Sequence, residues 1–286
     1  MDLGKQNILF FTRTMMLGGT ENVVLQLCEV FKPKVNKIVV CSCGGVNVEK
    51  LTEMGIRHYQ IPDISSKKDM FKICRTVKKI VEKEQITVIH SHHRMAAFYT
   101  EILFGSSIIK IANAHNTFFD KKLLTRFAYR NTKVIAVGKM VKKNLVDYFR
   151  IPEKQVSVIH NAVKPFDGDY IEDKYIRKLH DDGNFVVGNI GRLSEQKGME
   201  YFIEAIPKIL KKYPRTRFVI AGNGEDEQKL FSLVKKLGIE ECIKFLGYRK
   251  DVQNLMSQLD LIVLSSLWEG LPLTPIEVYS LSLIHI

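Results

Sequence analysis

The chain contains 286 residues, of which 45% are hydrophobic, 26% charged and 9% aromatic; these values are typical of globular proteins and exclude collagen-like, coiled-coil and low-complexity chains. A chain of this length has room for about two domains with sizeable cores. Its formal net charge is +12, which favours a partner that carries phosphate groups or an anionic surface. The excess lies in one half, because residues 1–165 hold 27 basic and 13 acidic residues, whereas residues 166–286 hold 16 and 18.

Short runs of β-branched or aromatic residues alternate with stretches of helical period, a pattern typical of βα units around a parallel sheet. In the first half the pattern predicts strands at Ile8–Phe11, Ile38–Cys41, His58–Ile61, Val88–His90, Ile108–Ala112, Val134–Val137 and Val156–Ile159. It predicts helices at Thr20–Phe31, with Thr20 as the N-cap, and at Met70–Lys83, and gives weaker indications of helices at Arg94–Leu103 and Val141–Phe149.

This order is lost between Val163 and Gly183, so residues 166–184 are predicted to link an N-terminal domain, 1–165, to a C-terminal domain, 185–286. The pattern then restarts, with strands at Phe185–Ile190, Arg217–Ala221, Ile243–Leu246 and Leu261–Leu264 and helices at Met199–Lys212, Asp226–Leu237 and Val252–Gln258. A doubly wound domain commonly has about six strands. Because the apolar end of the chain, residues 281–286, has no capping signal, the second domain is expected to be incomplete; an ordinary C-terminal strand is the alternative.

The cysteines give no sign of a metal site or a disulfide framework. They are Cys28, Cys41, Cys43, Cys74 and Cys242, odd in number and without the paired spacing of a zinc site. A reducing cytoplasm is therefore expected. The chain has no signal-peptide pattern, and its apolar stretches are much shorter than the ~20 residues of a membrane span, so any membrane contact is expected from outside the hydrocarbon.

Two glycine-containing loops follow predicted strands. Gly18-Gly19 lies between the first strand and the first helix, where a helix N-terminus can hold a phosphate; a simple tight turn would have the same pattern. The loop Gly191–Gly198 follows the first strand of the second half and carries Arg192 and Lys197. A guanidinium and an ammonium group at a strand end suit a diphosphate, although solvated surface charges are the alternative.

Two carboxylates, Glu269 and Glu277, follow the last predicted strand, with Pro272 or Pro275 near the start of a helix. Both can face one ligand while contacting different parts of it, and sugar or ribose hydroxyls are suitable donors to them. From the spacing alone, helix capping and surface solvation are the simpler interpretation.

Taken together, these motifs resemble those of the retaining glycosyltransferases of family 4, which have the GT-B fold. Ser265–Pro272 followed by Glu277 is similar to the family's motif of two glutamates separated by seven residues, and Gly191–Gly198 is similar to its diphosphate loop. Ala221–Gly224 and Leu246–Tyr248 resemble its next strand ends, and Gly18-Gly19 and Ala114–Asn116 its glycine loop and active-site histidine. The resemblance covers nearly the whole chain in order.

The resemblance implies an α/β fold of two tandem Rossmann-like domains that face a cleft, with the second domain incomplete. It implies a hexosyltransferase that moves a sugar from a nucleotide diphosphate sugar to a hydroxyl acceptor with retention of configuration. Glu277 would hold the ribose hydroxyls, Arg192 and Lys197 the diphosphate, and Glu269 the donor sugar. His115 would line the acceptor side, and Gly18 and Gly19 would let the backbone approach a phosphate. The family needs no metal, so cationic groups and helix N-termini would stabilise the leaving diphosphate.

The remaining histidines have several interpretations. His90, His92 and His93 stand at a strand end, but neighbouring positions point in different directions and no carboxylate or cysteine accompanies them. We therefore expect no metal here, and either acceptor contact or packing. His160 is expected at the crossover between the domains, and His58 and His180 as ordinary core or surface residues.

The basic first half is expected to serve the acceptor, a glycan or lipid-linked glycan, by peripheral contact with an anionic membrane at its inner face. Solvated helices are the alternative explanation of its lysines. A role in cell-surface polysaccharide biosynthesis is the expected setting. Other open hypotheses are a sugar-nucleotide epimerase of related fold, an inactive fragment, and a nucleic-acid-binding protein, which the lack of a stacking platform disfavours.

Overall fold

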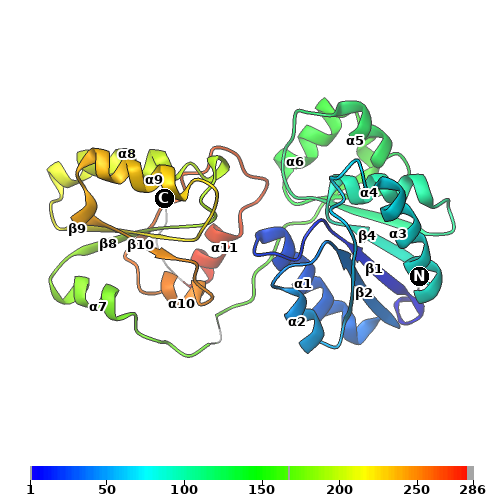
Figure 1. The fold of residues 1–286 in the computed structure, drawn as a ribbon, viewed down its shortest axis with the longest axis horizontal. Helices are drawn as coiled ribbons and strands as arrows, with labels where there is room; N and C mark the ends of the chain where they lie inside the picture. Colours follow the sequence, from blue (N-terminus) through cyan, green and yellow to red (C-terminus); the bar gives the residue numbers. More distant parts are fainter. Residues whose placement is uncertain (1, 167, 282–286) are drawn as a thin grey trace. The chain divides into compact units, whose positions relative to one another are not determined.

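The computed structural model describes residues 2–166 and 168–281 and divides into two compact units, Met1–Asn161 and Ala162–Ile286 (Figure 1). Each unit is an α/β domain around its own parallel sheet. The apolar chain end, on which the prediction of an incomplete second domain rests, lies at 282–286, outside the described residues. No helix within 2–166 and 168–281 has the length and apolar character needed to cross a membrane.

The first unit contains a seven-stranded parallel sheet in the order β3-β2-β1-β4-β5-β6-β7. Each strand overlaps a predicted one, with ends that differ by two residues at most. The strands are β1 (Asn7–Phe11), β2 (Lys37–Ser42), β3 (Arg57–Gln60), β4 (Val88–Ser91), β5 (Ile109–Ala114), β6 (Lys133–Ala136) and β7 (Val156–Val158).

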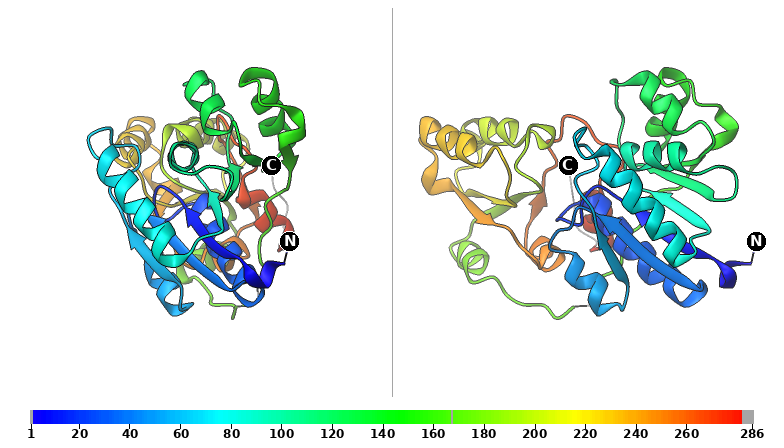
Figure 2. Two further views of the ribbon diagram at one scale, coloured as in Figure 1. Left: turned by 90° about the vertical axis from the view of Figure 1, so that its right-hand side faces the viewer. Right: turned by 45° about the vertical axis from the view of Figure 1, so that its right-hand side comes forward.

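The alternation of side chains along β1 builds a core on both faces of this sheet. Ile8 and Phe10 pack against the helices α1 (Gly19–Phe31) and α2 (Val48–Glu53). Leu9 and Phe11 pack on the other face, against α3 (Met70–Glu84) and α4 (Arg94–Leu103), so helices cover both faces (Figure 2). A strand buried on both faces reads as a continuous apolar run, which is why the sequence predicts these strands well.

The helices of the first unit depart from the predictions in three ways. Gly18, not Thr20, is the N-cap of α1, and Thr20 lies in the first turn. The predicted helix Val141–Phe149 is divided into α6 (Lys139–Lys143) and a π-helix, Asn144–Tyr148. Two short helices, α2 and α5 (Lys122–Ala128), were not predicted, because six or seven residues show too few turns for an apolar period to emerge.

The second unit contains a four-stranded parallel sheet in the order β10-β9-β8-β11. Its strands are β8 (Phe185–Ile190), β9 (Thr216–Ala221), β10 (Ile243–Gly247) and β11 (Leu261–Ile262). Its helices are α7 (Lys174–Asp181), α8 (Met199–Lys212), α9 (Glu227–Leu237), α10 (Val252–Met256) and α11 (Leu273–Ser280). Helices α8 and α9 pack on one face of the sheet, and α7, α10 and α11 on the other. The predicted elements of this half agree with the structure, apart from shorter ends of α10 and β11.

The segment 166–184, which the sequence predicts as a linker, contains helix α7. Ile176 and Leu179 of this helix are buried in the core of the second unit, and the division between the units falls earlier, at Asn161. Charged residues dominate the composition of the segment and hide its few apolar positions from a sequence pattern.

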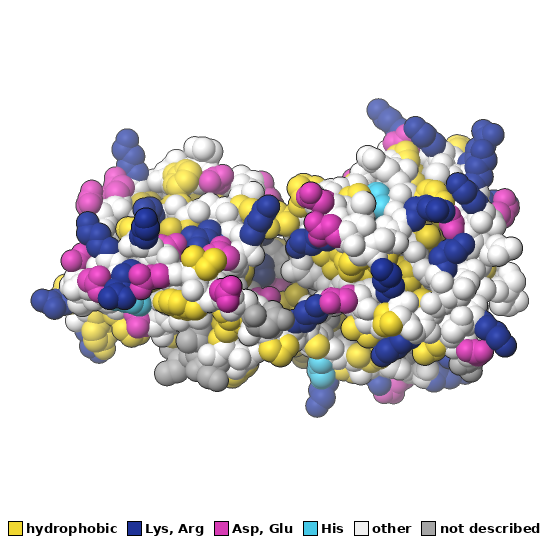
Figure 3. Space-filling view, turned by 90° about the horizontal axis from the view of Figure 1, so that it is seen from below, with side chains coloured by type: hydrophobic (Ala, Val, Ile, Leu, Met, Phe, Trp, Pro, Cys, Tyr) yellow, Lys and Arg dark blue, Asp and Glu magenta, His cyan; other side chains and the backbone are white. Residues whose placement is uncertain are grey.

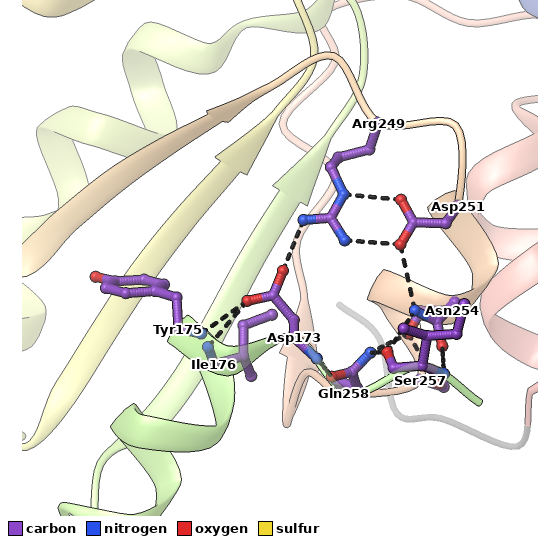
Figure 4. Close-up of polar contacts among 9 residues, drawn as sticks. Asp173, Tyr175, Ile176, Arg249, Asp251, Asn254, Ser257 and Gln258 are labelled. Atoms are coloured by element: carbon purple, nitrogen blue, oxygen red, sulfur yellow. Dashed lines mark hydrogen bonds and ion pairs between the residues drawn. The ribbon is translucent and has the colours of Figure 1, made fainter.

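A polar network joins the start of α7 to α10 (Figure 4). The Arg249 guanidinium donates to Asp173 at 2.6 Å and to both carboxylate oxygens of Asp251, at 2.8 and 2.7 Å. Asp173 also caps α7 by accepting from the backbone N–H groups of Tyr175 and Ile176. The guanidinium holds the pKa of the Asp251 carboxyl at about 2, so this network stays charged at neutral pH.

Candidate active site

The predicted site residues lie at the carboxyl ends of strands, near the point in each sheet where the strand order changes direction. In the first unit this point lies between β1 and β4, and in the second between β8 and β11. Ligands of open α/β sheets bind in the crevice outside such points. The structure therefore places one group of candidate residues in each unit.

In the second unit, the loop Gly191–Gly198 rests on the turn after β9. The backbone N–H of Leu193 donates to the Asn223 carbonyl at 2.9 Å. A Cβ atom at Gly222, where φ is +141°, would stand 1.9 Å from the Gly191 carbonyl oxygen, and one at Gly224 would stand 2.2 Å from that of Leu193. Only glycine permits so close an approach, so the Gly222-Asn223-Gly224 turn fixes the loop that follows β8.

The same loop is bound to the segment after β11 through several hydrogen bonds. The Ser265 hydroxyl accepts from Asn189 Nδ2 and donates to the Lys197 carbonyl, both at 2.9 Å. The backbone N–H of Leu267 donates to the Gln196 carbonyl at 2.8 Å, and Gln196 Nε2 donates to the Trp268 carbonyl at 3.0 Å. The two segments that carry the predicted donor-binding motifs therefore form one rigid surface.

This surface brings together two of the predicted residues that lie 72 positions apart. Lys197 Nζ lies 2.7 Å from Glu269 Oε1, and the two side chains are 20% and 19% exposed. The ion pair is thus accessible enough to exchange its partners for a ligand, and sheltered enough for its charges to be only partly screened. Asn189, Gln196 and Ser265 position it, and none of them was predicted as a site residue.

Arg192 and Glu277 lie on the same two segments of the chain. Arg192 is exposed on the loop after β8, and Glu277 lies on α11, which begins after Pro272. Burial raises the pKa of the Glu277 carboxyl, because removal from water disfavours its charged form. Such a carboxylate gains when ligand hydroxyls donate hydrogen bonds to it.

In the first unit, a cluster of histidines follows β4 and β5. His92 Nδ1 lies 3.1 Å from His115 Nε2, and His90 Nε2 lies 2.9 Å from Asn113 Oδ1. His90 and His92 are buried and His115 is half-buried. Burial lowers the pKa of His90 and of His115 to about 4 and lowers that of His92 further, so the cluster is neutral at pH 7.

The other predicted positions of the first unit have mainly structural contacts. His93 caps α4, because its Nδ1 accepts from the Met95 backbone N–H at 3.1 Å. Gly18 and Gly19 stand at the start of α1, where Gly18 has a φ of 176°, a value that any residue adopts. The buried Glu21 carboxylate in the first turn accepts from the Thr14 hydroxyl and already complements the helix dipole.

Within residues 2–166 and 168–281, no three or more His, Cys, Asp or Glu side chains are grouped so that they could hold a metal ion. This includes the histidine cluster after β4 and β5. His58, one of the histidines with no expected function, is half-buried and lies 2.8 Å from the Ser42 hydroxyl. His160 Nδ1 lies 3.1 Å from the Val137 carbonyl, in the first unit.

The fold is that of solved glycosyltransferase-like structures. The crystal structure of Anabaena Alr3699/HepE in complex with UDP superposes with a TM-score of 0.78 over 98% of this chain and 80% of that chain, at 20% sequence identity. A likeness at this identity concerns the fold alone. Two Rossmann-like domains of the GT-B type were expected, and this fold class is confirmed.

The family follows from the sequence. The model of "Glycosyltransferase Family 4" matches residues 17–165, and that of "Glycosyl transferases group 1" matches residues 171–286. The chain therefore belongs to glycosyltransferase family 4, as its motifs indicated.

Named relatives include a human and a bacterial protein. One phosphatidylinositol N-acetylglucosaminyltransferase subunit of Homo sapiens is 27% identical over 288 residues, which are 93% of this chain and 58% of that protein. The UDP-Gal:alpha-D-GlcNAc-diphosphoundecaprenol alpha-1,3-galactosyltransferase of Escherichia coli is 27% identical over 297 residues, 94% of this chain and 75% of that protein. The chain spans 41% and 64% of two uncharacterized glycosyltransferases of Methanocaldococcus jannaschii, so it covers less than two thirds of several relatives.

Proposed function

We propose that this chain acts as a retaining glycosyltransferase that moves a sugar from a nucleotide diphosphate sugar to a hydroxyl of a glycan or lipid-linked glycan. The observation that carries the proposal is the Lys197–Glu269 pair, held at the carboxyl ends of β8 and β11 by glycine contacts and backbone hydrogen bonds. Membership of family 4 and the UDP complex of a protein with the same fold support it.

The donor is proposed to bind along the two joined segments of the second unit. Arg192 and Lys197 bind the diphosphate, Glu277 accepts from the ribose hydroxyls, and Glu269 contacts the sugar. Donor binding then replaces the Lys197–Glu269 contact with two contacts to the ligand, ammonium to phosphate and carboxylate to hydroxyl. Since diphosphate charge grows as the sugar departs, the cations stabilise the transition state more than the bound donor. No metal is required for this role.

The reaction proceeds in this proposal on one face of the sugar. The bond from the anomeric carbon to the acceptor oxygen forms as its bond to the diphosphate oxygen breaks. The acceptor proton passes to a phosphate oxygen of the leaving diphosphate, so no protein nucleophile is needed. His115 lines the acceptor side, and Gly18 and Gly19 allow the backbone to approach a phosphate of the donor or acceptor.

The acceptor is proposed to be reached at an anionic membrane, with the protein on its cytoplasmic face in cell-surface polysaccharide assembly. The names of the human and Escherichia coli relatives specify lipid-linked substrates. On the face shown in Figure 3, lysine and arginine side chains are spread over the first unit, at the right. Co-sedimentation with vesicles tests this: binding should require anionic lipid and weaken with salt. Binding that is indifferent to both would refute the membrane contact.

The donor proposal is tested by thermal unfolding of the 286-residue chain with UDP-, GDP- and ADP-sugars. A donor at 100 times its Kd should stabilise the folded protein by about 2.7 kcal/mol. The Glu277→Ala variant is the matched control and should lose most of this stabilisation. If none of the nucleotide sugars raises the unfolding temperature, the chain does not bind a donor of these three kinds, and this proposal fails. Release of nucleoside diphosphate that requires an added acceptor distinguishes transfer from epimerisation.

A further inference from the structure

The His92–His115 contact supports an inference about how His115 is set for its task. The two rings are nearly parallel, with centroids 5.3 Å apart and an interplanar angle of 29°, and His92 Nδ1 lies 3.1 Å from His115 Nε2. His92 is itself fixed on its other sides, since its ring centroid lies 4.4 Å from that of His90 and 5.8 Å from that of Phe10. The backbone N–H of His92 donates to the Phe11 carbonyl at the end of β1.

The contact occupies one ring nitrogen of each histidine. Because both rings are neutral, one of the two facing nitrogens carries a proton and the other accepts it. The second nitrogen of His92, Nε2, is wholly buried and has no partner among the described residues. His115 Nδ1 is not among the wholly buried, unpartnered atoms of the described residues, which leaves it as the atom that can meet a ligand.

The unpartnered His92 Nε2 decides between the two proton positions. If His115 donated, His92 would carry its proton on Nε2 as a buried N–H without an acceptor. If His92 Nδ1 donates instead, Nε2 is a bare nitrogen. Buried donors without acceptors are rarer in proteins than under-satisfied acceptors. The second arrangement puts the proton of His115 on Nδ1.

We propose that His92 is a positioning residue that holds His115 in its neutral Nδ1–H form, so that His115 offers a hydrogen-bond donor to an oxygen atom of the ligand. His115 then does not act as a base, because Nε2 is occupied by His92 and Nδ1 already bears a proton. The ligand assignment rests on the proposed function, in which the acceptor proton goes to a phosphate oxygen. The proton position of His115 can be measured without any ligand.

The experiment is ¹H–¹⁵N correlation spectroscopy of the chain labelled with [¹⁵N]histidine, with the His115 signals assigned from a His115→Gln variant. The wild-type protein should show His115 protonated at Nδ1, the opposite of the preference of free histidine. A His92→Asn variant, whose amide nitrogen can replace the Nδ1 donor, should keep this form. A His92→Leu variant should shift His115 toward the Nε2–H form. Thermal unfolding verifies that each variant is folded.

His58→Gln is the matched control, because His58 is also a half-buried histidine of this unit but is bonded to a side-chain hydroxyl, that of Ser42. It should leave the His115 signals unchanged. An Nε2–H form of His115 in the wild type would overturn the proposal, and so would an unchanged His115 in a folded His92→Leu variant. Where transfer is measured, His92→Leu should lower kcat by about ten- to a hundredfold at an unchanged donor KM. Absence of donor binding would refute the proposed function and leave the proton position standing.

Discussion

Gly198 and Gly238 form a matched pair for testing how the donor-side segments are held together. Both are glycines of the second unit in the left-handed region, with φ of +56° and +64°. A Cβ at Gly198 would stand 2.3 Å from the Ser265 carbonyl oxygen, whereas one at Gly238 would have no atom within 4 Å. Alanine at either position meets the same backbone strain, and only alanine at Gly198 also meets Ser265.

The free energies of unfolding should separate the two effects. An alanine in the left-handed region costs about 1–2 kcal/mol, which is the whole effect expected for Gly238→Ala. Gly198→Ala adds the displacement of a backbone carbonyl by an atom that needs at least 3.0 Å, and overpacking of this kind costs about 1–3 kcal/mol. The expected loss at Gly198 is therefore roughly twice that at Gly238.

Urea unfolding measures the difference, since the midpoint moves with stability at constant slope. Stabilisation by a nucleotide sugar should be lost in Gly198→Ala, because the Lys197–Glu269 pair adjoins the displaced carbonyl. It should persist in Gly238→Ala. Equal losses of stability in the two variants, or unchanged donor binding in Gly198→Ala, would refute the account of this surface.

Further predictions concern the donor contacts and the Arg249 network. Glu277→Ala should weaken donor binding, whereas Arg192→Ala should mainly lower kcat, because the diphosphate charge grows in the transition state; steady-state kinetics in the complete enzyme would show equal effects if the roles are wrong. Because the folded pKa of Asp251 is about 2, below its usual value, its contribution to stability is complete above about pH 4 and is lost as the pH falls toward 2. Arg249→Ala should therefore lower the urea midpoint at pH 7 and have little effect near pH 2. Arg177→Ala, at an exposed arginine that also contacts two carboxylates, should cost less than about 1 kcal/mol; an equal loss would contradict the special role of Arg249.

The strands and long helices could be predicted because their signals are local. Strand β1 is buried at five successive positions, and helix α3 repeats apolar residues at helical spacing. Helices α2, α5 and α7 were missed because each is stabilised by one or two buried residues, which a window of sequence cannot distinguish from a loop. Their helical state depends on the sheet that they cover.

The sequence by itself determined the two α/β units, the order of their strands along the chain, and the motifs that define family 4. Only the tertiary structure decided which side chains meet: Lys197 with Glu269 across 72 positions, Ser265 with the loop after β8, and His92 with His115. The physical reason is that apolar periodicity reports burial of a residue by its own element. A contact between two loops depends on the register of neighbouring strands, which the packing of the whole sheet sets.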